Sequence, residues 1–254
     1  MSIDRELVDT AAEMAITAGE LTLDYFQTDR LDTERKADGT PVTVADKLTE
    51  RHLREAIGAR FPDDAIKGEE EADTPGTSGR CWYIDPIDGT SAFTRGVPTY
   101  STLLAIIDGE GPAVGVIHLP ALGETVTAGR GVGCFLNGEP TQVSTTDDIG
   151  SNTYFTTTGY EGFSPGQLTA CHNSGMSLRT WGDAYGYALV ATGRCDVMMD
   201  PVVNDWDVAP MPIILSEAGG RFTGLDGSDG FQAGHGIATN GHLHGRMLSL
   251  LGAS

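Results

Sequence analysis

Trp82-Tyr83-Ile84-Asp85-Pro86-Ile87-Asp88-Gly89-Thr90 is the stretch of this sequence that carries most information about its fold and chemistry. An apolar run leads into two aspartates three positions apart, and a glycine and a hydroxyl residue follow, where a helix can begin. Backbone N–H groups at a helix start attract anions, and carboxylate oxygens are preferred ligands of Mg2+. The stretch therefore predicts a metal site that faces a phosphate group.

A second acidic segment, Asn204-Asp205-Trp206-Asp207, lies far downstream. Hydrolysis of a phosphate monoester requires that an approaching anion is neutralised, a water ionised and the leaving oxygen stabilised, and divalent metals held by oxygen ligands do all three. Asp85, Asp88 and Asp207 are therefore candidate ligands. Two aspartates three residues apart are also common on helix surfaces, so the spacing alone would equally fit capping or solvated residues.

Four motifs together resemble the inositol monophosphatase-like family of Mg2+-dependent, Li+-sensitive phosphatases, from about residue 6 to about residue 250. The matching stretches, in the family's order, are 43–46 (TVAD), 68–70 (GEE), 82–90 (WYIDPIDGT) and 206–207 (WD), the last followed by 218–220 (AGG). The resemblance implies a layered α-β-α-β-α sandwich in an α/β (α+β) protein, two or three Mg2+ ions per site, and a homodimer.

By the same resemblance, each site residue has an expected role. The metal ligands would be Glu69, Asp85, the carbonyl of Ile87, Asp88 and Asp207. Asp46 and Thr90 would position the attacking water, and Lys36 occupies the place of a frequent active-site lysine.

We expect direct in-line attack by a water that Thr90 orients, with Asp46 or Glu69 accepting the proton and no phosphoenzyme. The backbone N–H groups of Gly89, Thr90 and Ser91 would hold the phosphate oxygens, next to Asp88 and Asp207. Purely structural roles are the alternative interpretation of some of these residues. Asp46 could cap the helix that follows it, and the acidic run at 69–71 could be a solvated surface.

The substrate is indicated by the segment 179–187 (RTWGDAYGY), continuing into 191–194 (ATGR). It resembles the histidinol-phosphate phosphatase branch of the family, as does Asp200-Pro201 followed by Asn204. Histidinol phosphate carries an ammonium group and an imidazole, which carboxylates can bind. Arg179, Asp183 and Asp200 are the expected substrate contacts, although Asp183 could instead cap a helix and Asp200 could end a strand.

Other functions stay open. Inositol 1-phosphate or a promiscuous range of phosphates is the main alternative, while bisphosphates are disfavoured because no cluster of Lys and Arg is evident in the sequence. A non-catalytic metal- or phosphate-binding regulatory module is an alternative of a different class. A P-loop is excluded because no G-x-x-x-x-G-K-[ST] motif occurs.

The composition of the chain limits the kinds of partner that it is expected to bind. Sixteen basic and 36 acidic residues among 254 give a formal charge of −20, which disfavours binding to nucleic acid or to an anionic membrane surface. No apolar run is long enough to span a bilayer, so we expect a cytoplasmic protein acting on a small phosphate monoester. The four cysteines form no C-x-x-C pair, which predicts reduced thiols rather than a zinc site.

The chain is expected to form a single phosphatase domain over 1–254, with the main metal site in 1–145 and substrate recognition in 146–254. Apolar spacing predicts helices at 7–25 and 46–60, joined by a polar loop at 33–43. Alternating segments predict strands at 102–107, 113–118, 125–128 and 134–136 in an antiparallel meander. The second half should mix strands near 153–156 and 196–199 with helices near 183–193, 207–218 and 241–250.

Overall fold

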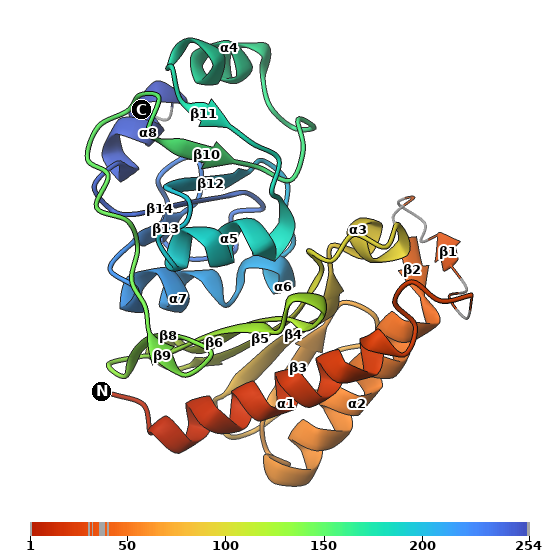
Figure 1. Ribbon diagram of the computed structural model, residues 1–254. Helices are drawn as coiled ribbons and strands as arrows, with labels where there is room; N and C mark the ends of the chain where they lie inside the picture. The colour runs from red at the N-terminus through yellow and green to blue at the C-terminus, as the bar shows by residue number, and fades with distance from the viewer. Residues whose placement is uncertain (1, 30, 32, 36–38, 40, 253–254) are drawn as a thin grey trace.

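The computed structural model describes the whole chain except residues 1, 30, 32, 36–38, 40 and 253–254. Its elements form five layers, in which two sheets alternate with three layers of helices (Figure 1). The predicted α-β-α-β-α sandwich is thus confirmed.

The first sheet has seven strands in the order β3-β4-β5-β6-β7-β8-β9. β3 and β4 are parallel, and every later neighbour is antiparallel, as the predicted meander requires. The strands are β3 (Ala65–Gly68), β4 (Cys81–Asp88), β5 (Ser101–Asp108), β6 (Gly111–Leu119), β7 (Glu124–Gly129), β8 (Gly133–Leu136) and β9 (Glu139–Pro140).

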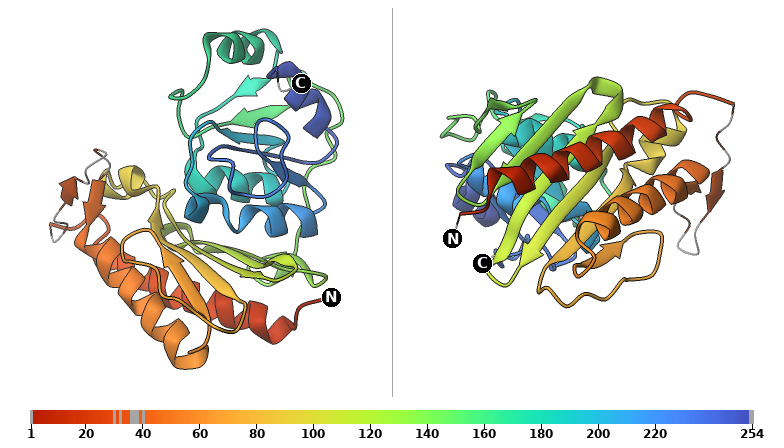
Figure 2. Two further views of the ribbon diagram at one scale, coloured as in Figure 1. Left: turned by 180° about the vertical axis from the view of Figure 1, so that it is seen from behind. Right: turned by 90° about the horizontal axis from the view of Figure 1, so that it is seen from below.

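Two long helices, α1 (Arg5–Leu23) and α2 (Val44–Arg60), cover the outer face of this sheet (Figure 2). The buried side of α1 carries small residues at helical spacing, including Ala11, Ala15 and Ala18, so the helix lies close to the strands. A short turn, η1 (Pro120–Leu122), follows β6.

The second sheet has five strands in the order β11-β10-β12-β14-β13. They are β10 (Tyr154–Thr156), β11 (Ser177–Leu178), β12 (Val197–Asp200), β13 (Arg221–Thr223) and β14 (Gly236–Thr239). The helices α5 (Asp183–Ala191), α6 (Asp205–Val208) and α7 (Met211–Glu217) lie between the two sheets, whereas α4 (Pro165–Asn173) and α8 (His244–Leu250) lie beyond the second (Figure 1).

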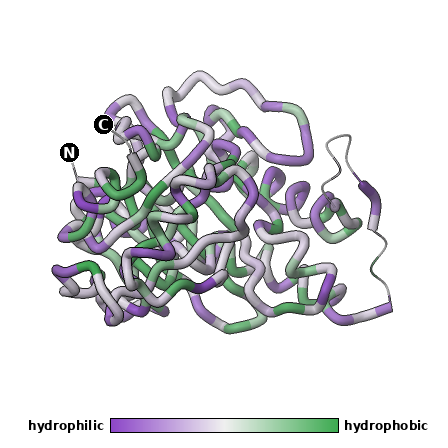
Figure 3. The backbone as a smooth tube through the Cα atoms, turned by 90° about the horizontal axis from the view of Figure 1, so that it is seen from above, coloured by the Kyte–Doolittle hydropathy of each residue, from purple (hydrophilic) through white to green (hydrophobic). Residues whose placement is uncertain are grey.

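The largest apolar cluster fills the space between the sheets, where α5 and α7 meet strands of both. A second cluster joins α1 and α2 to the first sheet. Hydrophobic segments gather in the interior of the molecule, and hydrophilic ones follow its outer turns (Figure 3). The boundary expected near residue 145 falls in the connection from β9 to β10; that the halves form one domain stays a prediction.

Several local expectations need correction. The polar loop at 33–43 contains two short antiparallel strands, β1 (Thr33–Arg35) and β2 (Pro41–Thr43). The helix expected at 207–218 is two helices, because Pro210 lacks the N–H that would continue the first. α4, β3, β9, β11, β13 and β14 were not predicted, because the strands among them have only two to four residues and α4 has little apolar periodicity.

His244 is buried at the start of α8, where its ring nitrogens lie 3.0 and 3.1 Å from the Thr223 and Thr239 hydroxyls. All four cysteines are free, with Cys81 only partly buried. None of the described helices combines the length and apolar character needed to cross a bilayer.

Candidate active site

Three carboxylates from the two predicted segments meet in space. Asp85 and Asp88 lie at the end of β4, and Asp207 lies on α6. One oxygen from each comes within 4.8 Å of the others. A register shift between Asp85 and Asp88 in the pairing of β4 with β5 interrupts the regular ladder at this point.

Asp88 is held by groups from both halves of the chain. Its Oδ2 accepts hydrogen bonds from the Ala184 N–H at 2.7 Å and the Ser101 hydroxyl at 3.1 Å. Gly89, which follows, has φ +76° and stands so close to α5 that a Cβ there would lie 2.8 Å from the Asp183 Oδ2. Glycine is therefore required both for the backbone conformation and for the close approach of α5.

Asp207 is positioned by the start of its own helix. The Asn204 N–H donates to Asp207 Oδ2 at 2.7 Å in a capping box. That contact leaves Asp207 fixed beside Asp88, so a four-residue helix delivers a carboxylate to the end of β4.

The negative charges of the cluster are largely buried and lie close together. Burial, and then the charges of Glu69, Asp88 and Asp207, raise the pKa of Asp85 well above its usual range. Burial and the neighbouring carboxylates also raise the pKa of Asp207 to about 7. Glu69, directly after β3, lies near this set, since its charge raises the pKa of both Asp85 and Asp207.

The composition of this set fits Mg2+. Every ligand atom it offers is an oxygen, which is the donor that Mg2+ takes. Like charges buried together are unfavourable unless a cation compensates them, and among the described residues no arginine or lysine forms an ion pair with Asp85, Asp88 or Asp207.

Asp46 and Thr90 also meet, as expected. The Thr90 hydroxyl donates to the Ile87 carbonyl at 2.9 Å and lies 3.4 Å from Asp46 Oδ1. Asp46 Oδ2 accepts from the N–H of Thr43, the true N-cap of α2, so Asp46 belongs to a capping box as well as to the site. Burial raises the pKa of Asp46 to about 6.

The predicted ligand role of Ile87 concerns its carbonyl, which also accepts the Thr90 bond and has a second lone pair. Ser91 lies in the first turn of α3 (Thr90–Thr94). Lys36 lies outside the described residues.

A small cavity of about 80 Å3 opens beside the carboxylates. It is lined by Asp88, Thr158, Asp183, Ala184, Tyr187, Asp200, Val202, Val203 and Asp207. Asp183 and Asp200 thus stand where the sequence placed substrate contacts. Thr158 supports both, because its hydroxyl accepts from the Asp183 N–H at 2.7 Å and its own N–H donates to Asp200 Oδ1 at 3.2 Å.

Arg179 does not line this cavity. Its guanidinium packs over the rings of Tyr154 and Trp181, at 5.5 and 5.6 Å from their centroids, and borders a separate apolar cavity beside Phe155. The structure therefore brings Asp183 and Asp200 to the carboxylates and leaves Arg179 apart from them.

Sequence reasoning missed Tyr187. Its side chain is buried and lines the cavity, and its hydroxyl lies near the Asp200 carboxylate without forming a well-aligned hydrogen bond to any described residue. The sequence did contain a signal for Tyr187: it follows Asp183 by four residues in a predicted helix, so both side chains lie on the same face of α5. Thr158 and Ser101 had no such signal, because they are distant in sequence from the motifs.

Comparison with known proteins agrees with these observations. The model of the inositol monophosphatase family matches residues 4–254. A histidinol-phosphatase of Chlorobaculum parvum is 41% identical over 242 residues, covering 94% of this chain and 93% of that protein. One from Mycobacterium tuberculosis is 37% identical, covering 96% of each.

Solved structures show the same architecture. The extragenic suppressor protein suhB of Bartonella henselae superimposes with a TM-score of 0.89 at 26% identity, covering 97% of this chain and 98% of that one. The IMPase of Thermotoga maritima has a TM-score of 0.88 at 31% identity, covering 97% of both. The resemblance and fold class inferred from the sequence are confirmed.

Proposed function

Since the chain belongs to the inositol monophosphatase family, we propose that it is a metal-dependent phosphatase that hydrolyses L-histidinol phosphate to L-histidinol and inorganic phosphate. The observation that carries the substrate choice is the cavity beside the carboxylate cluster. Asp183 and Asp200 face it without an ion-pair partner among the described residues, and they complement the ammonium and imidazole groups of histidinol phosphate.

The metal ligands we propose are Glu69, Asp85, the Ile87 carbonyl, Asp88 and Asp207. Bound Mg2+ would supply Lewis-acid stabilisation of the phosphoryl charge and a water of lowered pKa. By holding the metal next to Thr90, the carboxylates would place the bound phosphate within reach of the water that Thr90 orients.

Residues of the chain would orient the attacking water and accept its proton. The Thr90 hydroxyl orients the attacking water, and Asp46, 3.4 Å away, accepts its proton, with Glu69 as the second candidate. A pKa of about 6 for Asp46 suits a general base near neutral pH. The N–H groups of Gly89, Thr90 and Ser91 would hold phosphate oxygens, and no covalent intermediate is needed.

Further proposals follow from the same resemblance. We propose inhibition by Li+, a homodimer and a role in histidine biosynthesis in the cytoplasm. Four free thiols support a reducing compartment. Lys36, in the segment before β2, stays a proposed active-site residue.

The test is kcat/KM for phosphate release from L-histidinol phosphate and from inositol 1-phosphate in parallel, with Mg2+, for the parent and for Asp183→Asn. We expect a preference for histidinol phosphate that collapses in the variant. Equal or greater use of inositol 1-phosphate would overturn the substrate assignment in favour of an inositol phosphatase. No release from either ester would instead favour a non-catalytic module.

A further inference from the structure

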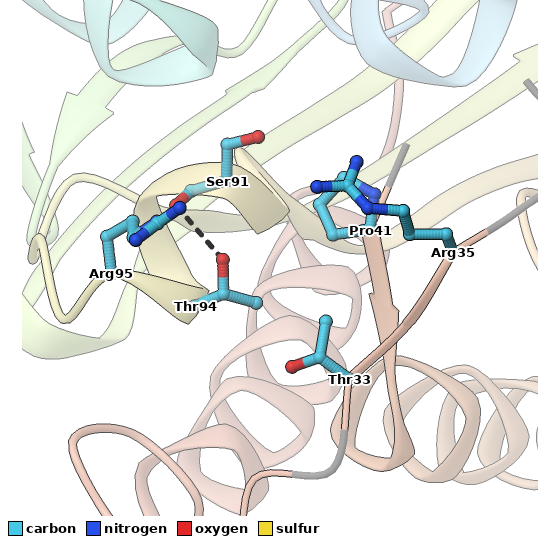
Figure 4. A pocket seen from close by; sticks show the side chains of 6 residues that line it. All are labelled: Thr33, Arg35, Pro41, Ser91, Thr94 and Arg95. Carbon is cyan, nitrogen blue, oxygen red and sulfur yellow. Dashed lines mark hydrogen bonds between the residues drawn. The ribbon is translucent and has the colours of Figure 1, made fainter. Parts of the chain in front are cut away.

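A second polar pocket, of about 370 Å3, adjoins the active site on the side of α3. It is lined by Thr33, Arg35, Pro41, Ser91, Thr94 and Arg95. Arg35 comes from β1 and Arg95 from the end of α3, and Figure 4 shows their guanidinium groups extending toward the pocket from opposite sides. Its volume falls in the range of small-molecule sites, about 300–1,000 Å3.

The charge pattern of the whole chain makes these two arginines unusual. Of the thirteen arginines in the sequence, twelve are described, and nine of those lie within ion-pair distance of a carboxylate. Among the described residues, Arg35, Arg95 and Arg179 have no such partner. Arg179 packs against the stacked rings of Tyr154 and Trp181, and the other two arginines both line one pocket.

A chain with 36 acidic residues could have paired these arginines internally. Instead, Arg35 Nη1 donates to the Gly39 carbonyl at 2.7 Å, a contact that orients the guanidinium without neutralising it. Two guanidinium groups in one pocket, without an ion-pair partner among the described residues, favour an anion from outside the chain, and arginine's planar fork matches phosphate oxygens. The Ser91 and Thr94 hydroxyls add neutral hydrogen-bonding groups to the wall.

The pocket is directly connected to the proposed chemistry. Ser91 follows Thr90, whose hydroxyl lies 3.4 Å from Asp46, and Arg95 lies one helical turn after Ser91. An anion between the arginines would therefore lie next to the phosphate being hydrolysed. Sixty residues separate Arg35 from Arg95, which is why the sequence showed no basic cluster.

We propose that the Arg35–Arg95 pocket is a second phosphate-binding site beside the catalytic one. Its ligand is a phosphate group, either inorganic phosphate released by the reaction or the second phosphate of a bisphosphate substrate. The role in turnover rests on the proposed phosphatase function, whereas the binding of phosphate rests on the two arginines.

Binding is tested on metal-free protein in EDTA, where the carboxylate cluster repels phosphate and cannot contribute. Inorganic phosphate is titrated by calorimetry into the parent, into Arg35→Gln/Arg95→Gln, and into Arg221→Gln. Arg221 is an exposed arginine of β13 paired with Asp229, so its variant removes a positive charge outside the pocket. All three substituted positions are exposed, and circular dichroism checks the folding of the variants.

We expect the double variant to bind phosphate at least about tenfold more weakly than the parent, because charge-assisted hydrogen bonds are lost, and Arg221→Gln to bind like the parent. Absence of phosphate binding in the metal-free parent, or equal binding by parent and double variant, would overturn the proposal.

The two sources of phosphate are separated with Mg2+ present. If the pocket holds a second phosphate, the double variant loses kcat/KM for fructose 1,6-bisphosphate and keeps it for fructose 6-phosphate. If it holds released phosphate, the inhibition constant of inorganic phosphate rises and both sugar phosphates are used as before. A parent inactive on histidinol phosphate would overturn the proposed function while leaving the metal-free binding result intact.

Discussion

Tyr187 has a buried hydroxyl that forms no well-aligned hydrogen bond with any described residue, although it lies near Asp200 at the wall of the cavity that also contains Asp183. A buried polar group without a hydrogen bond is costly, so we infer that the substrate supplies the missing contact. Tyr187→Phe should raise KM for histidinol phosphate about tenfold, since about one hydrogen bond to a charged group is lost. Steady-state kinetics measure this change.

A small aryl phosphate that does not reach the cavity is the matched control for Tyr187→Phe. Its hydrolysis should be unchanged, and the variant should be as stable as the parent or slightly more stable, because an unsatisfied hydroxyl has been removed. An unchanged KM for histidinol phosphate would exclude the contact.

Asp85 combines burial with three neighbouring carboxylates that raise its pKa. Asp85→Asn removes one buried charge, so the metal-free variant should melt at a higher temperature than the metal-free parent. It should also lose nearly all phosphatase activity and most of the rise in Tm that Mg2+ gives the parent through binding to the folded state. Thermal melts with Mg2+ and with EDTA, beside an activity assay, measure all three effects.

Near-parental turnover by Asp85→Asn would show that the metal is held elsewhere. Glu217→Gln is a comparison outside the cluster, since Glu217 accepts hydrogen bonds from the Gly131 and Gly133 N–H groups. That variant should be less stable, yet it should keep its response to Mg2+.

Among the elements, helix α1 packs closely on the first sheet because Gly19 has no side chain. A Cβ at this position would overlap the His118 ring and lie 2.9 Å from Pro120 Cγ. Gly19→Ala should therefore destabilise the protein by about 1–3 kcal/mol through overpacking, despite the better helix propensity of alanine. Urea unfolding measures the change.

Gly58 in α2 provides the matched control, because it is exposed and a Cβ there would meet nothing within 4 Å. Gly58→Ala should stabilise the protein by about 0.5–1 kcal/mol through helix propensity alone. If both variants shift stability in the same direction, α1 does not approach the sheet as closely as the structure indicates.

His118 lies on β6 beneath α1, with Nδ1 2.9 Å from the Thr125 hydroxyl. Burial lowers the pKa of His118 to about 4 in the folded protein, whereas in the unfolded chain its pKa is the usual value of about 6.5. The unfolded state thus binds more protons between these values, so stability is full above pH 6.5 and falls as the pH falls toward 4.

The lowered pKa of His118 costs the folded state at most about 3 kcal/mol of stability as the pH falls. His244 acts in the same direction and the raised carboxylates of the site act in the opposite one, so the free energy of unfolding is compared between parent and His118→Gln. Their difference should shrink or reverse from pH 7 to pH 4.5. A difference independent of pH would show that His118 has the same pKa in the folded and unfolded states, so that burial does not lower it.

The elements were largely predictable because their signals are local. The stretch 82–90 contains a strand, a turn and a helix start, and all three form there. Apart from the meeting of Asp85 and Asp88 with Asp207, contacts between distant segments were not predictable. Ala184 donates to Asp88 across 96 positions of sequence, and Arg179 begins the predicted segment 179–187 but packs on Tyr154 instead of lining the cavity. Motif spacing specifies neighbours along the chain, whereas these contacts depend on how the two sheets pack.

For the whole molecule, the formal charge of −20 is the dominant long-range property. Ion pairs offset part of it, including Arg130 with Asp108 at 2.7 Å and Arg194 with Glu124 at 2.6 Å. Exposed pairs contribute little each, about 0–1 kcal/mol, and there are more than twice as many acidic as basic residues. Repulsion among the remaining carboxylates should therefore exceed the attraction within the pairs.

Salt should then stabilise this protein. Raising KCl from 0.01 M to 1 M shortens the screening length from about 30 Å to about 3 Å, which weakens repulsion between separated carboxylates more than attraction within close pairs. We expect Tm to rise throughout the series, measured by calorimetry in EDTA so that site metal does not contribute. Sucrose at matched osmolality separates screening from water activity. A Tm that falls with KCl would mean that the ion pairs, rather than the excess acidic residues, control the stability of the fold.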